Sequence, residues 1–236
     1  MEQTIQQLKK QVHTLKLYNT AGGVLLLFLL FSAFKNPQQK FDVIRAKGLI
    51  IEDSAGRDRI LLGAPVPYSA SRVRTDTALV RKYWAKNFGN PNQYMKWYNG
   101  YYHGAIGMVV MSDSGFDRVL LGDKLADPNT GKRMFEPAGL LWNDRHGWER
   151  GGAGANTTED GQTRSVVGVD NAGGEAAHIF ALEDGTNAVA ISGDDGMLLL
   201  GFSKKNGAYF ENKESFTGIK FFNKTGTLVW EQKMNQ

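Results

Sequence analysis

Hydrophobic residues in this chain come in short runs that are separated by glycine and by polar stretches. In residues 48–63 the run LII is followed by EDSAGRDR and then by the run ILL, with a glycine at each end. Aspartate or asparagine at the first turn position accepts a hydrogen bond from the backbone two residues on. Glycine three positions later supplies the positive φ that closes the turn. The pattern therefore predicts a β-hairpin.

The same hairpin pattern occurs several times along the chain. DRILLG at 58–63 returns as DRVLLG at 117–122, in the second strand of the next unit. The copies are GLIIEDSAGRDRILLG at 48–63, GMVVMSDSGFDRVLLG at 107–122, GLLWNDRHGWERGGAG at 139–154, GIKFFNKTGTLVWEQ from residue 218, and two degenerate copies at 166–185 and 188–201. We therefore expect a series of equivalent two-stranded units.

The apolar runs do not alternate with polar residues, as they would in a strand with one wet face. Continuous runs indicate burial on both faces, which a single hairpin cannot achieve alone. The copies must then pack on one another, and an interface with another subunit would add to that burial. We predict a mainly β fold of stacked β-hairpin repeats, solenoid- or prism-like, preceded by one long N-terminal helix.

An apolar segment, AGGVLLLFLLFSAF at 21–34, lies between two lysines. Eighteen uncharged residues separate Lys16 from Lys35, which is at the short end of what crosses a bilayer. We predict an uncleaved signal anchor with its span at about residues 18–34, in contact with membrane lipid. A cleavable signal peptide and a buried soluble helix are the alternatives, and the segment lacks a clear small-x-small cleavage site. Basic residues flank both ends, so the positive-inside rule does not decide the orientation.

Four apolar residues before the span follow the rhythm of a coiled coil. Ile5, Leu8, Val12 and Leu15 recur at intervals of three and four residues. Two heptads also suit an amphipathic helix on a membrane surface, with Lys9, Lys10 and Lys16 toward anionic lipid. The coiled-coil interpretation predicts a parallel homo-oligomer. We divide the chain into an anchor at 1–40 and a β-repeat body at 41–236, placed on the extracytoplasmic side of a bacterial cytoplasmic membrane by analogy with signal anchors.

The positive charge of the chain belongs to the anchor. Of 28 basic and 24 acidic residues, five lysines and one glutamate lie in residues 1–40, which leaves 23 basic and 23 acidic residues in the body. A nucleic-acid-binding body normally has a basic excess, so we expect no nucleic-acid partner. The chain has no cysteine, which excludes disulfides and thiolate metal sites.

Residues capable of catalysis are few and scattered. The four histidines have no metal-ligand spacing. Asp144, His146 and Glu149 in NDRHGWER could perform acid–base chemistry. Their segment occupies the turn position of the hairpin pattern, however, and we interpret Asp144 as a turn residue. We therefore predict a protein that is not an enzyme, without a metal site or a cofactor.

Three segments resemble a family of uncharacterised bacterial proteins that have a short basic start, one apolar helix and a glycine-punctuated body. They are FDVIRAKGLIIEDSAGRDR, GLLWNDRHGWERGG and HIFALEDG. The resemblance extends from Leu15 to about Gly201, and the insert at 68–103 departs from it. It implies a membrane-anchored or exported β-rich protein of unassigned activity, and it carries over no catalytic residues.

The insert at 68–103 is rich in aromatic residues. Rings with polar groups are common at interfaces and at sugar-stacking sites. The candidate contact residues are Tyr83, Trp84, Tyr94, Trp97, Tyr98, Tyr101 and Tyr102. We predict a protein or subunit interface, with a glycan platform and a plain packed loop as alternatives. Together these features predict a self-associating, membrane-anchored structural, scaffold or binding subunit of a cell-envelope assembly, in which other envelope proteins could take part. The alternative function is a glycan-binding or glycan-active protein that uses the insert.

Overall fold

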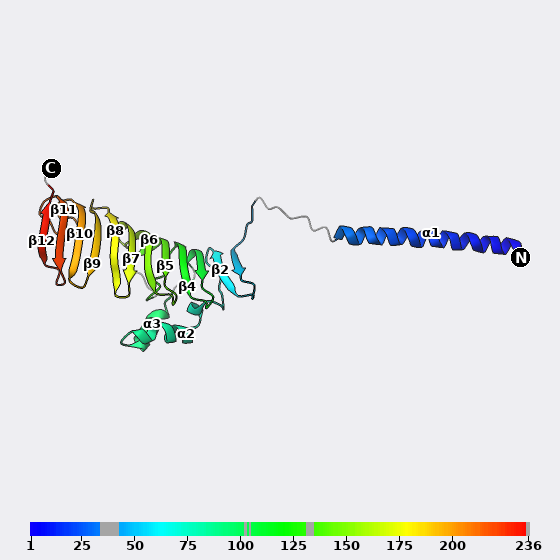
Figure 1. Cartoon of the computed structure of the whole chain (residues 1–236), viewed down its shortest axis with the longest axis horizontal. Coiled ribbons are helices and arrows are strands. Elements are labelled where there is room, and N and C mark those ends of the chain that lie inside the picture. The colour runs from blue at the N-terminus through cyan, green and yellow to red at the C-terminus, as the bar shows by residue number, and fades with distance from the viewer. Residues whose placement is uncertain (34–42, 102, 104, 131–134, 235–236) are drawn as a thin grey trace. The chain divides into compact units, whose positions relative to one another are not determined.

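The computed structural model describes residues 1–33, 43–101, 103, 105–130 and 135–234. It contains two units, residues 1–45 and residues 46–236. The first unit holds helix α1, Glu2–Ala33 (Figure 1), so the predicted stripe and the described part of the predicted span belong to one continuous helix. This helix is long and apolar enough to cross a membrane.

The body is a single antiparallel β-sheet. In the described part of the chain it has twelve strands, and each strand pairs with the next one in sequence. The strands are β1 (Gly48–Glu52), β2 (Asp58–Gly63), β3 (Ile106–Met111), β4 (Asp117–Asp123), β5 (Glu136–Asn143), β6 (Glu149–Thr157), β7 (Thr163–Asn171), β8 (Gly174–Leu182), β9 (Asn187–Gly193), β10 (Gly196–Ser203), β11 (Phe216–Asn223) and β12 (Leu228–Lys233). The prediction of a mainly β fold after one long N-terminal helix is confirmed.

The two degenerate copies form hairpins of another kind, with two-residue turns between Asn171 and Gly174 and between Gly193 and Gly196. The β1–β2, β3–β4 and β5–β6 hairpins have equivalent geometry. Their framing glycines pair across each hairpin, Gly48 with Gly63 and Gly107 with Gly122. A β-bulge follows the third apolar residue of the first strand in both, next to Glu52 and next to Met111. The hairpin at 139–154 has the same glycine pairing and the same bulge. The repeated sequence therefore encodes a repeated register.

The turns repeat as closely as the strands. In the first hairpin the Gly56 N–H donates to the Asp53 carbonyl at 2.9 Å, and the Asp53 carboxylate accepts from the backbone N–H of Ala55 and Arg57. Gly56 has a φ of +72°. Asp144 and Asn223 accept the equivalent bonds in their own turns, each followed three residues later by a glycine with positive φ. The predicted role of the polar residue and the glycine is confirmed in these three turns, whereas Ser112 takes the first position of the β3–β4 turn, where its hydroxyl accepts from the Phe116 N–H.

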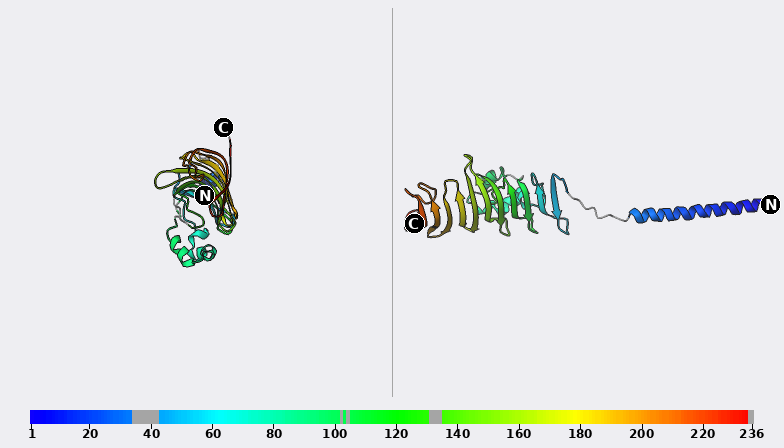
Figure 2. Two further views of the ribbon diagram at one scale, coloured as in Figure 1. Left: turned by 90° about the vertical axis from the view of Figure 1, so that its left-hand side faces the viewer. Right: turned by 90° about the horizontal axis from the view of Figure 1, so that it is seen from above.

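The hairpins join edge to edge, which differs from face-to-face stacking. β2 continues into β3 with Leu61 opposite Val109, although the whole insert separates them in the sequence. Each hairpin offers an unpaired row of backbone N–H and C=O groups, and the next hairpin satisfies that row. The expectation that the copies bury both faces of one another is therefore wrong within one chain. Viewed end-on, the strands of the body curve around a common axis (Figure 2).

One face of the sheet is covered by the segments that connect its strands. Leu61, Val109 and Leu120 form a core with Val66 and Leu125 from the connecting segments. Farther along, Phe180, Leu199 and Phe222 form a second core with Phe210 from the loop after β10. We call this side the covered face.

A row of glycines crosses six adjacent strands on the covered face. Successive pairings connect Gly48, Gly63, Gly107, Gly122, Gly139 and Gly154. A Cβ atom on Gly107 would lie 2.0 Å from the Leu121 carbonyl oxygen, and one on Gly139 would lie 2.2 Å from the Ala153 carbonyl oxygen. The backbones approach too closely there for a side chain, and the same holds at Gly122 and Gly154, which explains the framing glycines of the copies at 107–122 and 139–154.

The arginine of the repeated DR pair connects each hairpin to the next. Arg59 donates to the Asp53 carboxylate in its own hairpin and to the carbonyls of Ser112 and Asp113 in the following turn. Arg118 reaches the Asn143 carbonyl in the same way. Five fixed donors let one guanidinium satisfy several carbonyl oxygens at once. The motif therefore fastens successive turns together.

Candidate interaction surfaces

The insert is a small helical subdomain packed against the turns of the β3–β4 and β5–β6 hairpins (Figure 1). Its elements are η1 (Val73–Thr75), α2 (Thr77–Tyr83), η2 (Ala85–Asn87) and α3 (Pro91–Tyr98). Asp76 caps α2 through bonds from the backbone N–H of Ala78 and Leu79. Asn90 caps α3, where proline occupies the first turn.

Most of the predicted contact aromatics lie inside this subdomain. Trp84 and Tyr94 are fully buried, and Tyr98 and Tyr101 are nearly so. They form one core together with Phe116 from the β3–β4 turn. For these four residues the prediction of an exposed contact surface is corrected, because their rings cover one another and the hairpin turns. Of the other three predicted contact residues, Trp97 is 39% exposed and Tyr83 is half-buried. Tyr102 lies outside the described residues.

A buried ion pair attaches the insert to the sheet. Arg72 donates from Nε and Nη2 to the two carboxylate oxygens of Asp117 at 2.8 and 2.7 Å, and both side chains are 4% exposed. The Asp117 carbonyl accepts a further bond from the Asn143 amide. Bidentate geometry makes this pair the strongest type of charged contact. The sequence did not predict this ion pair. Asp117 is the aspartate of the repeated DR pair, and nothing near it in the sequence distinguishes it from the other copy.

Arg74 lies in an aromatic cage within the same core. Its guanidinium carbon is 3.7 Å from the centroid of the Trp84 ring, and Tyr98 and Tyr101 also face it. Aromatic faces attract a cation electrostatically, more strongly when water is excluded. Arg74 also donates to the Tyr94 hydroxyl at 3.4 Å. Burial raises the pKa of Tyr98 well above its ordinary value, so this ring stays neutral beside the cation.

His103 makes the stability of this core sensitive to pH. Burial lowers its pKa to about 4, and the positive charges of Arg72 and Arg74 add to that effect against the opposing Asp117. The unfolded chain protonates near the ordinary histidine pKa of about 6.5. Between these values the unfolded state binds more protons, so stability is full above about pH 6.5 and decreases as the pH falls toward 4.

We therefore expect His103→Phe to flatten the decrease in melting temperature between pH 6.5 and 4. Thermal unfolding of the detergent-solubilised full chain at several pH values measures it. Burial also lowers the pKa of His178, so part of the pH dependence of the melting temperature should remain in the His103→Phe variant. His146→Phe at an exposed position is the control, and an equal flattening in that variant would contradict the assignment.

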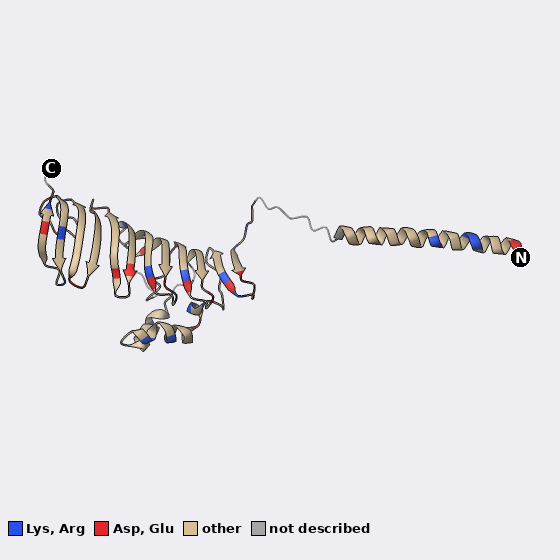
Figure 3. Cartoon of the chain, in the orientation of Figure 1, with Lys and Arg blue, Asp and Glu red and all other residues tan. Residues whose placement is uncertain are grey.

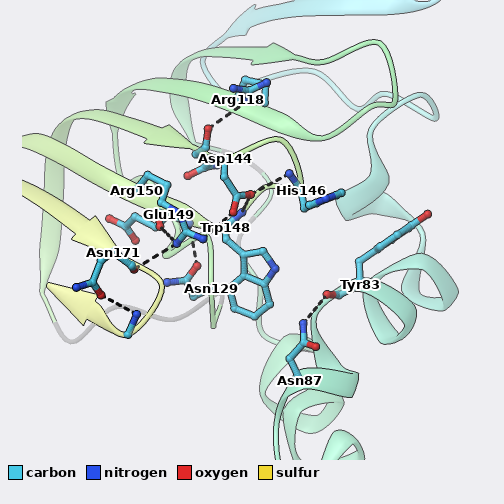
Figure 4. A network of polar contacts seen from close by, with 12 residues as sticks. Tyr83, Asn87, Arg118, Asn129, Asp144, His146, Trp148, Glu149, Arg150 and Asn171 are labelled. Carbon is cyan, nitrogen blue, oxygen red and sulfur yellow. Dashed lines mark hydrogen bonds and ion pairs between the residues drawn. The ribbon is translucent and has the colours of Figure 1, made fainter. Parts of the chain in front are cut away.

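Asp144 and His146 lie in the turn of their hairpin, and Glu149 begins β6, where its N–H donates to Asn129 Oδ1 at 3.0 Å (Figure 4). The Asp144 carboxylate accepts from the backbone N–H of His146 and from Arg150 Nη2, both at 2.8 Å. The His146 ring contacts Phe116. Asp144 is thus the turn residue that the pattern predicts. Among the residues that the structure describes, no group of three histidines or carboxylates is arranged to hold a metal ion.

The predicted association stripe is exposed on α1. Ile5, Leu8, Val12 and Leu15 are each at least half exposed, and the span residues that follow are exposed as well. Within the described residues of this chain, these side chains have no neighbouring element to cover them. The helix therefore presents an apolar stripe outside the span and an apolar surface all round within it.

The side of the sheet opposite the covered face is apolar along its whole length, and we call it the apolar face. Two rows of cross-strand neighbours run along it from β1 to β12. The first row is Leu49, Leu62, Met108, Leu121, Leu140, Ala153, Val167, Ile179, Val189, Leu200, Ile219 and Gln232. The second row is Ile51, Ile60, Val110, Val119, Trp142, Gly151, Val169, Ala177, Ile191, Leu198, Phe221 and Trp230. None of these described positions is charged. Ile179 is 59% exposed and Ile191 51%. A hollow of about 730 Å³ lies over β7–β10, lined by Val167, Ile179, Leu200 and Phe202.

Another cavity, of about 290 Å³, lies over β5–β8. Its lining includes Gly139, Gly152, Gly154 and Gly168 together with Asp127, Glu149, Arg164, Asp170 and Glu175. Gly139 and Gly154 belong to the glycine row, and Gly152 and Gly168 lie side by side in the adjacent row, so few strand side chains fill this part of the covered face. Asp127, Glu149 and Asp170 each take part in further interactions.

The fold defines the chain as an open, single-layer β-meander that follows one helix able to cross a membrane. Comparison with family models, with curated proteins and with solved structures found no match.

Proposed function

We propose that the chain is a membrane-anchored, self-associating scaffold or binding subunit of a bacterial cell-envelope assembly, with its β body on the extracytoplasmic side. One observation carries the proposal. The 32 residues of α1 form a single helix that includes both a lysine-flanked apolar span and an exposed apolar stripe before it. At about 1.5 Å per residue the helix is about 48 Å long, more than the roughly 30 Å hydrocarbon core requires.

The remaining turns of α1 suit association between parallel helices. Ile5, Leu8, Val12 and Leu15 lie on one side of the helix, at the spacing that packs knobs into holes. Copies inserted in one membrane also meet at a high effective concentration, which compensates for a short coiled coil. The body adds a continuous sheet of twelve described strands, a long surface suited to a scaffold.

Membrane anchoring is tested by placing charge in the span. Leu26→Lys with Leu29→Lys should move the protein from the carbonate-resistant membrane fraction into the supernatant, because each lysine at a helix centre costs about 3 kcal/mol of insertion. Gln3→Lys with Gln6→Lys adds the same charge outside the span and should leave the protein in the membrane. Retention of the span variant would contradict the anchor. Protease added to intact spheroplasts tests on which side of the membrane the body lies. It should cleave the body if the body is extracytoplasmic and leave it intact otherwise.

Self-association through α1 is tested in the same membranes. Leu8→Lys with Val12→Lys should decrease the mass of the detergent-extracted assembly, since charges replace the centre of the stripe. Gln7→Lys with Gln11→Lys places equal charge off the stripe and should preserve the assembly. An unchanged mass in the first variant would refute the helix as an association element.

A further inference from the structure

We propose that the apolar face is an interface between copies of this chain, so that the sheets of neighbouring copies pack face to face. The inference deepens the proposed function, and it rests on it for the parallel membrane tethers that bring the copies together. Its occupant is another copy of the same chain. The physical basis is the placement of charge, the area of the face and its repeated construction.

Charge is absent from the two central rows of this face, with Asp123 of β4 at its edge, and charged residues are present elsewhere on the sheet. Within the described strands, the 24 positions of its two rows include no Lys, Arg, Asp or Glu. Lys220 and Glu231 lie opposite each other in the middle of β11 and β12, and Lys220 is buried with Phe210 and Phe216 on the covered face. Figure 3 shows most other charged strand residues near the turn ends. A sheet face exposed to water normally carries polar residues, so this face is built for burial.

The area of the face matches what a stable interface needs. Twelve described strands at a spacing of about 4.8 Å give a length of about 55 Å. Two rows of side chains, each about 6.6 Å wide, give a width of about 13 Å. The strip therefore covers about 700 Å², close to the roughly 800 Å² per partner of a standard protein interface. Only a partner of similar length covers it from β1 to β12.

A second copy supplies such a partner. It has the same rows of side chains at the same strand spacing, and packed sheets interdigitate their inner side chains at a separation of about 10 Å. The hollow over β7–β10 has Phe202 at its rim, 59% exposed, as a side chain able to enter the facing sheet. Coverage by a membrane surface fits less well. Residues 41–236 have 23 basic and 23 acidic side chains, whereas elements that lie on membranes have an excess of Lys and Arg.

Cysteine crosslinking in native membranes tests the interface, because the full chain has no cysteine of its own. Copies with parallel tethers are related by rotation about a common axis, so a residue near that axis faces its own counterpart. Leu121→Cys and Ile179→Cys, introduced singly, should each crosslink between copies with a bis-maleimide that spans about 10 Å. Asp195→Cys and Lys224→Cys in exposed turns are the controls and should crosslink at least tenfold less.

A second variant shows whether the face itself holds the copies. Val167 and Ile179 are direct cross-strand partners. Val167→Lys with Ile179→Lys should reduce crosslinking through Leu121→Cys at least tenfold, while the circular dichroism of the β body stays unchanged. Equal crosslinking of face and turn cysteines would overturn the proposal, and so would crosslinking that persists in the lysine variant. Labelling of Ile179→Cys by thiol-reactive lipid without crosslinking between copies would assign the face to a membrane instead.

Leu8→Cys separates failure of this inference from failure of the proposed function. Crosslinking at Leu8→Cys without crosslinking at Leu121→Cys and Ile179→Cys would leave association through α1 intact and would refute the sheet interface. Crosslinking at the two sheet positions without crosslinking at Leu8→Cys would support the sheet interface and refute association through the helix stripe.

Discussion

Asp117→Ala is expected to destabilise the body by about 3–5 kcal/mol, because it leaves the buried Arg72 guanidinium without its counter-ion. Arg72 is 4% exposed and donates both of its bonds to this one carboxylate. For a body of about this size, 1 kcal/mol corresponds to about 2–4 °C in melting temperature, so the decrease should exceed about 6 °C. Thermal unfolding of the detergent-solubilised full chain followed by tryptophan fluorescence measures it.

Two further variants identify the cause. Arg57→Ala removes an ion pair to Asp53 whose arginine is 54% exposed, and it should change stability by less than about 1 kcal/mol. Arg72→Met combined with Asp117→Leu removes both charges and should destabilise less than Asp117→Ala alone. If the double variant were the less stable of the two, the cost would arise from packing, and the uncompensated charge would not explain it.

Gly122→Ala is expected to destabilise the sheet by about 3 kcal/mol, the upper range for an added methyl group in a packed site. A Cβ atom there would lie 2.0 Å from the Ile106 carbonyl oxygen and 2.8 Å from the Gly107 Cα. Both contacts are with the backbone of the paired strand, so no side-chain rotation relieves them. The two strands must separate, which weakens the hydrogen bonds of the β3–β4 hairpin.

Gly193→Ala is the matched control for this prediction. Gly193 also lies in a strand, but an added Cβ meets nothing within 4 Å. Its melting temperature should stay within about 2 °C of the parent, as for a surface substitution of about 0.5 kcal/mol. Equal destabilisation by both substitutions would mean that glycine flexibility matters generally, and that the close approach of backbones at Gly122 has no special role.

Local features of the body were predictable from sequence. The β1–β2 turn is formed by bonds among the five consecutive residues from Asp53 to Arg57, so residue type and spacing suffice to specify it. The continuous helix before the body follows in the same way from its apolar run and flanking lysines.

Contacts between distant segments were not predictable in the same way. The aromatic residues of the insert indicated an exposed surface, yet Trp84 and Tyr94 are core residues of a subdomain. Aromatic density is the same in an interface and in a core, and only the position of the neighbouring turn distinguishes them. Likewise Asp117 has a buried partner because Arg72, 45 residues earlier, is brought beside it.

The sequence by itself thus determined the units of this protein: one apolar helix, and hairpins of which the first three share one register. Only the tertiary structure decided how the units combine. It joined the hairpins by their edges into one sheet, covered one face with connecting segments, packed the insert against the hairpin turns, and left the apolar face open. The physical reason is that a turn is stabilised within its own few residues. Edge pairing, ion pairs and core burial depend on which distant segments meet, and many arrangements satisfy the same local pattern.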